Sequence, residues 1–461
     1  MSENVLLEAR LTKLDYVRAI TNPYPERFEK THELKEAALL ADETTGVRVA
    51  GRILSMRKMG KMSFLMLSDI EGKLQIAVKK DMVGEKTLRA TQIFFLGKSL
   101  RPLPEKFHGI QDTETCYRKR YLDLLMNEAT KEFFLKKVQF MREMRRYLED
   151  EGYMEIETPV LIDHPSGATA RPFTAHHNAL NMDVYLRIAP ETYLKRAIVG
   201  GFTKVFEFAR CFRNEGMDAT HLQDFTMVEG YCAYYNYRDN MKFLQNMLTS
   251  VITKIWGTPQ ITVNGTVIDF SAQWEVITFR DLILRDCGID IEAYETAEKL
   301  LARIEKEGID LASGTDPHQL GRGNLIDLLY KKVSRPKLIA PTFLIQHPTD
   351  LSPLARANDE NPQICDRFQL IINGAEIINA YSELVNPQEQ RERLIEQARC
   401  KANGDEEAMM MDEDYLTAME YGMPPISGWG MGIERVLQVL MDKENIRDCV
   451  LFPLMRPLTE S

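Results

Sequence analysis

Apolar residues recur at helical spacing in two stretches of the chain. Residues 4–20 alternate apolar and charged positions with a period close to 3.6, and prolines 23 and 25 end the segment. The same period returns at 132–150, where five apolar residues fall on one stripe. We predict a helix over each stretch, and the stripe of the second consists of Phe134, Val138, Met141, Met144 and Leu148.

Between these helices the pattern changes to a period of two, which is typical of strands. We predict strands at 47–54, 63–69 and 73–79, the last two joined as a hairpin. If Glu71 and Gly72 are the two loop residues, Ile70 lies opposite Lys73. Because side chains alternate across a strand, one face then forms a core. That face holds Leu65, Leu67, Leu74, Ile76 and Val78, and the other holds Phe64, Met66, Ser68 and Gln75.

The second face places an aromatic ring beside an amide, with Arg57 just upstream and Lys58 and Lys61 in the connecting loop. A ring beside cations is how small β-barrels stack single-stranded nucleic acid. The alternative is that Phe64 is an ordinary core residue, and the pattern alone favours that alternative.

Beyond a proline-bearing linker at 102–107, strand and helix patterns alternate to the end. Strands are predicted at 205–212 and 225–231 around a charged loop, and amphipathic helices at about 232–340 suggest a helical insertion. Alternating glycines at 428–432 indicate a strand that leads into a helix at 433–440 with Arg435 in its first turn. This spacing fits neither common glycine-rich phosphate loop.

Composition narrows the class of protein. A chain of 461 residues with 44% hydrophobic and 27% charged residues is typical of a globular protein with two or three domains. No apolar run approaches the roughly 20 residues of a membrane helix, and the start resembles no targeting peptide. Seven dispersed cysteines suggest neither a disulfide framework nor a zinc site. We therefore expect a cytoplasmic protein, and the net charge of −10 argues against a general nucleic-acid coat.

Three segments in this order, 155–161, 204–231 and 428–440, resemble the signature motifs of class II aminoacyl-tRNA synthetases. Further segments resemble the lysyl-tRNA synthetases in particular, and the resemblance extends over nearly the whole chain. These segments are EKFHGI…YRKRYLDLL (105–125), SGATARPFTAHHNALNMDVYLRIAPETYLKR (166–196), FRNEG (212–216), EIINAYSEL (376–384) and IRDCVLFPLMRP (446–457).

The resemblance implies an α+β fold, in which an antiparallel sheet flanked by helices follows an OB-type β-barrel. The implied domains are an N-terminal helical segment at 1–40, an anticodon-binding barrel at 41–104 and a catalytic domain at 105–461. It also implies a homodimer, with helix 132–150 and Pro159 at the interface. The implied activity forms lysyl-adenylate from L-lysine and ATP with Mg²⁺, then transfers lysine to the 3′ end of tRNA(Lys).

Individual site residues follow from the same resemblance. Arg213 and Arg435 are the implied catalytic residues, and they bind ATP together with Glu215, His221, Phe225 and Glu376. The implied lysine receptors are Gly167 and Glu191 for the α-ammonium, Arg213 and Asn379 for the carboxylate, and Tyr231 and Glu383 for the ε-ammonium. Arg57, Phe64 and Gln75 are the implied anticodon readers, and Glu376 and Gln369 the implied metal-binding residues.

The chain departs from the family pattern in three places. Gln369 stands where a second metal-binding glutamate is usual, and Leu222 and Asp224 alter the loop after the second motif. The barrel is also short, because only about eight residues follow 73–79 before TLRATQIFF, where a five-stranded barrel needs a further strand.

Two other functions compete with this one. A related ligase that attaches lysine to a protein would lack the barrel predicted at 47–97. A non-catalytic RNA-binding relative would have no need of Arg213, Glu376, Glu383 and Arg435 together.

Overall fold

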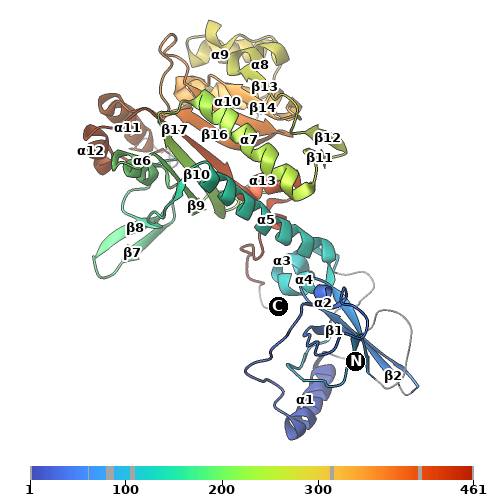
Figure 1. Ribbon diagram of the computed structural model, residues 1–461. Coiled ribbons are helices and arrows are strands. Elements are labelled where there is room, and N and C mark those ends of the chain that lie inside the picture. Colours follow the sequence, from blue (N-terminus) through green and yellow to red (C-terminus); the bar gives the residue numbers. More distant parts are fainter. Residues whose placement is uncertain are drawn as a thin grey trace. The chain divides into compact units, whose positions relative to one another are not determined.

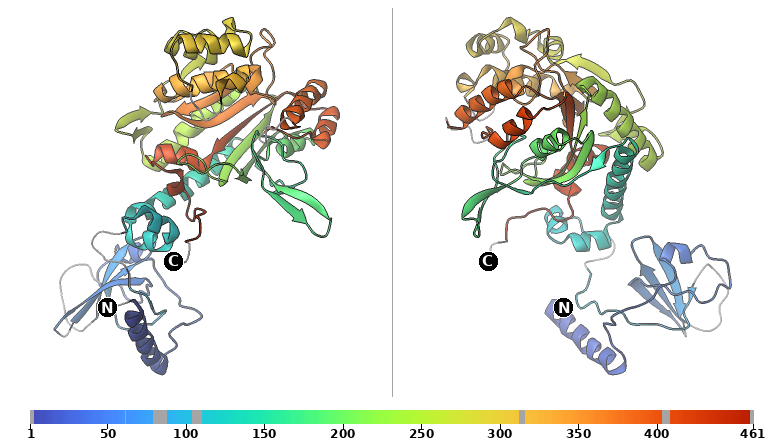
Figure 2. Two further views of the ribbon diagram at one scale, coloured as in Figure 1. Left: turned by 180° about the vertical axis from the view of Figure 1, so that it is seen from behind. Right: turned by 60° about the vertical axis from the view of Figure 1, so that its left-hand side comes forward.

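The computed structural model describes residues 3–60, 62–78, 88–103, 110–311, 316–402 and 408–458. The chain divides into two compact units, Met1–His108 and Gly109–Ser461 (Figures 1 and 2). Lys61 and most of the predicted linker, 104–107, lie outside the described residues. Within the described residues, no helix is both long enough and apolar enough to cross a membrane.

The first unit contains the predicted N-terminal helix and a small sheet. Helix α1 spans Glu3–Ile20, which confirms the prediction, and α2 spans Leu34–Ala37. The sheet has the order β1-β2-β3-β4, and β4 runs parallel to β3. Its strands are β1 (Arg52–Met59), β2 (Met62–Ser68), β3 (Lys73–Val78) and β4 (Leu88–Arg89).

The first predicted strand, 47–54, is wrong over its first half. Strand β1 begins at Arg52, and Lys58 lies in this strand instead of in the loop. The backbone of Arg48 is bound elsewhere: its carbonyl accepts from the N–H of Thr31 at 2.8 Å, and its N–H donates to the Thr31 hydroxyl at 2.8 Å. Val47 and Val49 still pack on the core of this unit, as their apolar character requires.

The hairpin has the predicted faces but a different register. Ser68 lies opposite Lys73, so the loop has four residues, not two. Asp69 accounts for the longer loop, because its carboxylate accepts from the N–H groups of Glu71 (2.8 Å) and Gly72 (2.9 Å). A slip of two residues leaves every side chain on its predicted face. Accordingly Leu65, Leu74 and Ile76 are buried, with Leu67 and Val78 packed against them.

The second unit is built on an eight-stranded sheet of order β13-β14-β15-β16-β17-β10-β9-β5. All neighbouring pairs are antiparallel except β13–β14 and β5–β9. The predicted strands at 205–212, 225–231 and 428–432 are confirmed. The sheet consists of β5 (Met154–Glu155), β9 (Lys204–Phe212), β10 (Asp224–Ala233), β13 (Glu275–Thr278), β14 (Thr342–Ile345), β15 (Arg367–Ile372), β16 (Ala375–Ser382) and β17 (Ile426–Gly432).

Helices and smaller strands surround this sheet, so the predicted α+β class is confirmed (Figure 1). The helices are α3 (Thr113–Arg118), α4 (Arg120–Met126), α5 (Glu128–Asp150), α6 (Glu191–Val199), α7 (Tyr237–Trp256), α8 (Phe279–Cys287), α9 (Ala297–Lys306), α10 (Arg322–Val333), α11 (Pro387–Ala402), α12 (Glu413–Glu420) and α13 (Ile433–Leu440). The smaller strands are β6 (Leu161–Ile162), β7 (Thr174–His177), β8 (Met182–Leu186), β11 (Gln260–Val263) and β12 (Thr266–Asp269).

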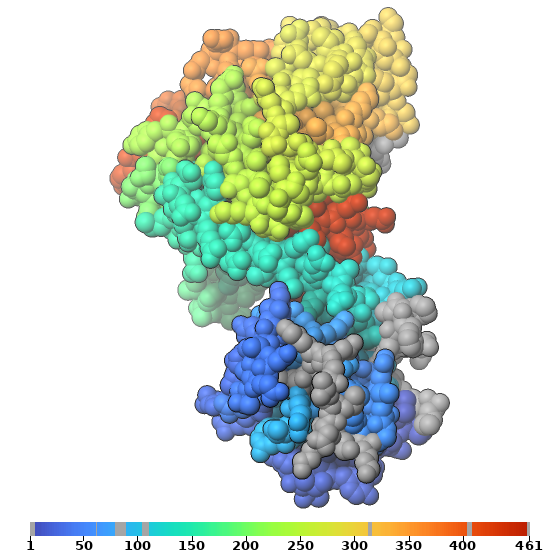
Figure 3. Space-filling view, turned by 45° about the vertical axis from the view of Figure 1, so that its right-hand side comes forward, coloured from blue at the N-terminus to red at the C-terminus, as the bar shows by residue number. Residues whose placement is uncertain are grey.

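Helices α5 and α7 pack against each other and cover the sheet through one large apolar core. The predicted stripe of α5 is partly wrong: Val138 is 63% exposed, whereas Phe133 and Phe140 are buried. Phe134, Met144 and Leu148 are buried as predicted, so the buried stripe keeps most of the predicted face and extends toward Phe133 and Phe140. Part of α5 (teal in Figure 3) reaches the surface of the second unit, which agrees with the exposure of Val138.

The segment expected to be a helical insertion, 232–340, is more varied than its helical pattern indicated. Helix α7 belongs to the main core, β11 and β12 form a hairpin, and β13 joins the main sheet. Helices α8, α9 and α10 form a second apolar cluster together with β14 and β15 of the sheet. This cluster includes Phe279, Ile283, Leu300, Ile304 and Leu329.

The two faces of the β2–β3 hairpin should respond differently to truncation. Leu74→Ala removes a side chain that is 6% exposed, and should destabilise the first unit by about 2–5 kcal/mol. Gln75→Ala, one residue along on the other face, should change stability by less than about 0.5 kcal/mol. Hydrogen exchange of β2 and β3 in the full chain measures both, and equal loss of protection would contradict the assigned faces.

Candidate functional site

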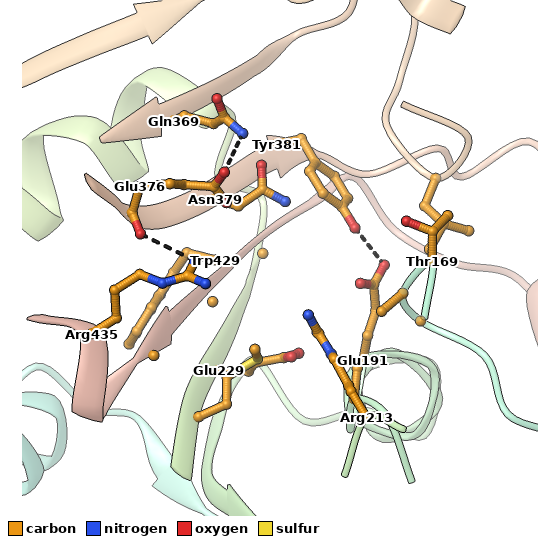
Figure 4. A pocket seen from close by; sticks show the side chains of 18 of the residues that line it. Thr169, Glu191, Arg213, Glu229, Gln369, Glu376, Asn379, Tyr381, Trp429 and Arg435 are labelled. Carbon is orange, nitrogen blue, oxygen red and sulfur yellow. Dashed lines mark hydrogen bonds between the residues drawn. The ribbon is translucent and has the colours of Figure 1, made fainter. Parts of the chain in front are cut away.

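A cavity of about 340 Å³ opens over β10, β15, β16 and β17 (Figure 4). Strand alternation decides which residues reach it. Met227, Glu229 and Tyr231 of β10 line the cavity, while Val228 is buried in the main core. The cavity therefore lies on the face of β10 turned away from that core.

The structure brings most of the predicted site residues to this cavity. They come from the loop between β6 and β7, from α6, from the β9–β10 hairpin and from β15, β16 and α13. The residues that line it are Gly167, Glu191, Arg213, Glu215, His221, Phe225, Tyr231, Gln369, Glu376, Asn379 and Arg435.

Glu383 is the predicted site residue that lies behind the cavity wall. It is 1% exposed and forms an ion pair with the ammonium of Lys195, which is itself completely buried. Lys195 also donates to Glu191 at 2.5 Å. Burial alone would lower the pKa of Lys195, but the charges of Glu191 and Glu383 raise it well above its ordinary value. Lys195 is therefore a fixed cation held between two carboxylates.

Tyrosine rings complete the surroundings of this ammonium. The Lys195 nitrogen lies 6.0 Å from the ring centre of Tyr231, 5.6 Å from that of Tyr381 and 5.8 Å from that of Tyr415. The Tyr381 hydroxyl donates to Glu191 at 2.7 Å (Figure 4). Four elements, α6, β10, β16 and α12, thus meet around one buried charge.

Two glycines allow this close packing. A Cβ on Gly428 would lie 2.2 Å from the Tyr231 ring and 2.5 Å from a carboxylate oxygen of Glu383. Gly167 has a φ of +87°, and a Cβ there would lie 2.9 Å from Cβ of Glu191. Gly167 and Glu191, predicted together from the sequence, are thus direct neighbours.

Glu229 is a third carboxylate at this end of the cavity, and sequence reasoning missed it. It is 4% exposed and accepts from the Tyr231 hydroxyl at 3.1 Å. Burial, reinforced by the charge of Glu191, raises its pKa to about 8. Two spacings in the sequence could have revealed these residues. Glu229 lies two residues before Tyr231 and so on the same face of a strand, and Lys195 lies four residues after Glu191 and so on the same face of a helix. The site thus has three carboxylates and one resident ammonium.

The other end of the cavity carries arginines and a ring. The Arg213 guanidinium lies 5.2 Å from the ring centre of Phe225, and its Nε is buried without a hydrogen-bond partner. Arg435 donates to the backbone carbonyl of Glu376 at 3.4 Å. Arg367, which was also missed, lines the cavity and donates to the side-chain oxygen of Asn379 at 2.9 Å. Cationic and planar groups here suit a phosphorylated, aromatic ligand.

The two predicted metal-binding residues lie side by side. The Gln369 amide donates to the Glu376 carboxylate at 2.8 Å (Figure 4). Across the described ranges, no cluster of three His, Cys, Asp or Glu side chains has metal-binding geometry. One carboxylate and one amide oxygen are hard ligands that fit Mg²⁺ when the ligand supplies further oxygens.

The loop between β9 and β10 is held by its own side chains. His221 lies 2.8 Å from Asp218, and hydrogen bonds from Thr220 and His221 outweigh burial to lower the pKa of Asp218 to about 2. Asp224, one of the departures from the family pattern, forms an ion pair with Arg210. Leu222, the other departure in this loop, does line the cavity.

In the first unit, the three predicted anticodon-reading residues share a face. Arg57 of β1 lies directly opposite Phe64 of β2, and Gln75 of β3 lies opposite Met66 on the same side. Phe64 is half-buried and the core residues of the hairpin lie on the other face, so the structure rejects the alternative that Phe64 belongs to the core.

Comparison with known proteins gives a consistent result. Residues 112–456 match the family of class II tRNA synthetases (D, K and N). The lysine–tRNA ligase of Carboxydothermus hydrogenoformans is 42% identical over 487 positions, which cover 98% of each chain. That of Moorella thermoacetica is 41% identical over 100% of this chain and 99% of its own, and that of Pasteurella multocida is 41% identical over 97% and 96%. The 487 aligned positions exceed the 461 residues here, so the first relative has residues that this chain lacks.

The raised pKa of Glu229 predicts a pH-dependent stability. Its pKa rises from about 4.5 to about 8 on folding, so the folded state increasingly loses stability as the pH rises through this interval. Glu229→Gln removes that loss, and should make the variant more stable relative to wild type at pH 9 than at pH 5. The expected difference is on the order of 4 kcal/mol. Denaturant unfolding at both pH values, without ligands, measures it, and a pH-independent difference would contradict the assignment.

Proposed function

This chain belongs to the lysine–tRNA ligase family of class II tRNA synthetases, and on that basis we propose that it activates L-lysine with ATP and transfers it to the 3′ end of tRNA(Lys). The observation that carries the proposal is the excess of carboxyl groups around Lys195, which lie at and behind the wall of the cavity that Arg213 and Arg435 line. One end suits a diamino acid and the other a nucleotide.

Charge balance favours lysine as the amino acid. Burial raises the pKa of Glu229 to about 8 and that of Glu383 well above its ordinary value, so the one ammonium of Lys195 cannot keep Glu191, Glu229 and Glu383 all ionised. A second ammonium entering the cavity would pair with the carboxylate that Lys195 leaves unmatched. A substrate with a carboxylate side chain, such as aspartate, would add to the excess negative charge.

We assign the two ammonium groups of lysine to different walls. Gly167 and Glu191, which touch, would hold the α-ammonium. Tyr231, with Glu383 behind it, would receive the ε-ammonium, and Glu229 beside the Tyr231 hydroxyl adds a further charge. Asn379, oriented by Arg367, would bind the lysine carboxylate together with Arg213.

The reaction then needs positioning and charge stabilisation more than a protein nucleophile. The lysine carboxylate attacks the α-phosphorus of ATP, and pyrophosphate leaves as the mixed anhydride forms. Arg213 would stabilise the charge that develops on the phosphoryl oxygens, while Phe225 and Arg435 hold the adenine between them. Glu215 and His221, which line the same cavity, would complete the nucleotide site. In the second step a ribose hydroxyl of the terminal tRNA adenosine attacks the anhydride, and AMP leaves.

Mg²⁺ would be held by Glu376, by the amide oxygen of Gln369 and by ATP phosphates. When bound, it neutralises phosphate charge. These two side chains would supply the protein's ligands to the ion, and the hydrogen bond from Gln369 would hold the Glu376 carboxylate in position.

The first unit would read the anticodon through Arg57, Phe64 and Gln75. Its presence favours tRNA over a protein as the acceptor of lysine. We also assign the domains as 1–40, 41–104 and 105–461, and a cytoplasmic location.

A homodimer through the first motif accounts for apolar residues left on the surface of the second unit. These include Leu135 and Val138 on α5 and Val160 and Leu161 beside Pro159, exposed by 40%, 63%, 39% and 53%. Two of them lie on the helix, and two come directly after the proline, that the family resemblance places at the dimer interface.

Two assays test the proposed activity. The chain should catalyse ATP–pyrophosphate exchange that depends on lysine and not on aspartate or asparagine. It should also charge tRNA(Lys). Exchange without charging would indicate a different acceptor. The absence of both exchange and charging would refute the proposal.

Arg213→Ala should reduce the exchange rate by about 10²–10³, because it removes a donor directed at the developing charge. Arg238→Ala, an exposed arginine on α7, serves as the control and should leave the rate unchanged. Circular dichroism should show both variants folded. Exchange at the wild-type rate in Arg213→Ala would remove this residue from the mechanism.

Gln369→Glu should lower the Mg²⁺ concentration required for half-maximal exchange, because a hard cation prefers a charged oxygen ligand. The measurement is a Mg²⁺ titration at fixed ATP. An unchanged or higher requirement would mean that water or phosphate oxygens already supply this position.

Phe64→Ala should weaken tRNA binding by about 1–3 kcal/mol if an anticodon base stacks on the ring. Exchange without tRNA should stay normal, since the cavity belongs to the other unit. Charging at sub-saturating tRNA measures the effect, with Ser63→Ala as the neighbouring control. Normal charging by Phe64→Ala would show that this face does not read the anticodon.

A further inference from the structure

Glu434 is a buried carboxylate in the first turn of α13 that the mechanism above does not use. It is 1% exposed, and its two oxygens serve different elements. One accepts from the ammonium of Lys137 on α5 at 2.8 Å, and the other from the backbone N–H of Thr226 on β10 at 2.9 Å. A single side chain therefore joins three elements that are distant in sequence.

The contact with Thr226 lies where the sheet stops. Pairing between β10 and β17 ends with Met227 opposite Gly432, because β17 gives way to α13 there. The next strand N–H, that of Thr226, donates to the Glu434 side chain instead. The carboxylate thus continues the interaction between the two elements past the end of the strand pair.

The residues next to these two contacts are the proposed walls of the nucleotide site. Arg435 follows Glu434 in α13, and Phe225 precedes Thr226 in β10. Both side chains line the cavity. Glu434 thus links the backbones next to the two walls, through charge-assisted hydrogen bonds that are shorter and stronger than neutral ones.

Lys137 supplies the charge that this carboxylate requires. It is 16% exposed and also donates to the backbone carbonyl of Cys449 at 2.8 Å. Nearby, the N–H of Ile446 donates to the carbonyl of Ala219 in the β9–β10 loop at 2.8 Å. Lys137 thus holds the segment that also restrains the loop over the cavity.

We propose that Glu434 and Lys137 are positioning residues that set the spacing of Phe225 and Arg435, and so control the affinity for the nucleotide. The inference rests on the proposed function for the identity of the nucleotide as ATP. The side-chain hydrogen bonds of the pair go to each other, to Thr226 and to Cys449, and none of these residues is assigned to lysine.

The test is calorimetric titration of the full chain with ATP and Mg²⁺, and separately with lysine. Lys137→Met leaves Glu434 buried without its cation, and should weaken ATP binding about tenfold to a hundredfold, as expected for misplacement of the binding groups. Lysine affinity should change less than about threefold. Lys137→Arg keeps the charge and should retain most of the ATP affinity.

A matched control separates positioning from general loss of stability. Leu300→Ala opens a cavity in the second apolar cluster, where Leu300 is completely buried, and should lower the melting temperature without changing ATP affinity. Glu434→Gln should match Lys137→Met. If Glu434→Gln does not fold, the comparison of Lys137→Met with Lys137→Arg and Leu300→Ala still distinguishes a positioning role from a general loss of stability.

Unchanged ATP affinity in Lys137→Met, or equal loss of ATP and lysine affinity, would overturn the inference. Wild-type exchange measured alongside keeps the two claims distinct. Normal exchange with unaffected ATP binding in Lys137→Met would refute only the positioning role. A wild-type chain that binds no ATP would overturn both.

Discussion

The structure of the site depends on one buried ammonium. Lys195 has no exposed surface, and it can remain charged only because Glu191 and Glu383 surround it. Because their side chains surround this ammonium, α6, the end of β16 and the tyrosines of β10 and α12 lie close together. The same arrangement leaves more carboxyl groups than one ammonium can balance, and we propose that a diamino acid supplies the second cation. Folding and specificity therefore rest on the same charges.

The two ends of the cavity use electrostatics differently. At the end that we assign to lysine, the folded protein already bears the desolvation cost of buried carboxyl groups, and a bound ammonium would offset it. At the nucleotide end, Arg213 and Arg435 present fixed cations beside an aromatic ring. The strand face supports both, because its alternation turns Glu229 and Tyr231 to the cavity and Val228 to the core.

Many of the secondary-structure elements and their faces could be predicted from the sequence. Period-two alternation predicted the faces of the hairpin, and the glycine pattern predicted the passage from β17 to α13. The hairpin register was wrong because Asp69 caps a longer loop, a local hydrogen bond that periodicity does not reveal. The stripe of α5 was displaced because a surface residue, Val138, has the same apolar character as a core residue. The site residues came from family resemblance, and residues to which the resemblance gave no role, such as Glu229, required the three-dimensional arrangement.

The central claim is that lysine supplies the positive charge that the three carboxylates lack. Its most direct test is the number of protons released when lysine binds, from calorimetry at pH 7 in buffers of different ionisation enthalpy. The pKa of Glu229 is about 8 in the free site, so its carboxyl group is mostly protonated at pH 7. A bound ammonium should lower this pKa, and close to one proton should then pass from Glu229 to the buffer. Glu229→Gln should bind lysine with no such release. Lysine binding without proton release by the wild-type chain, or equal release by the variant, would contradict the account.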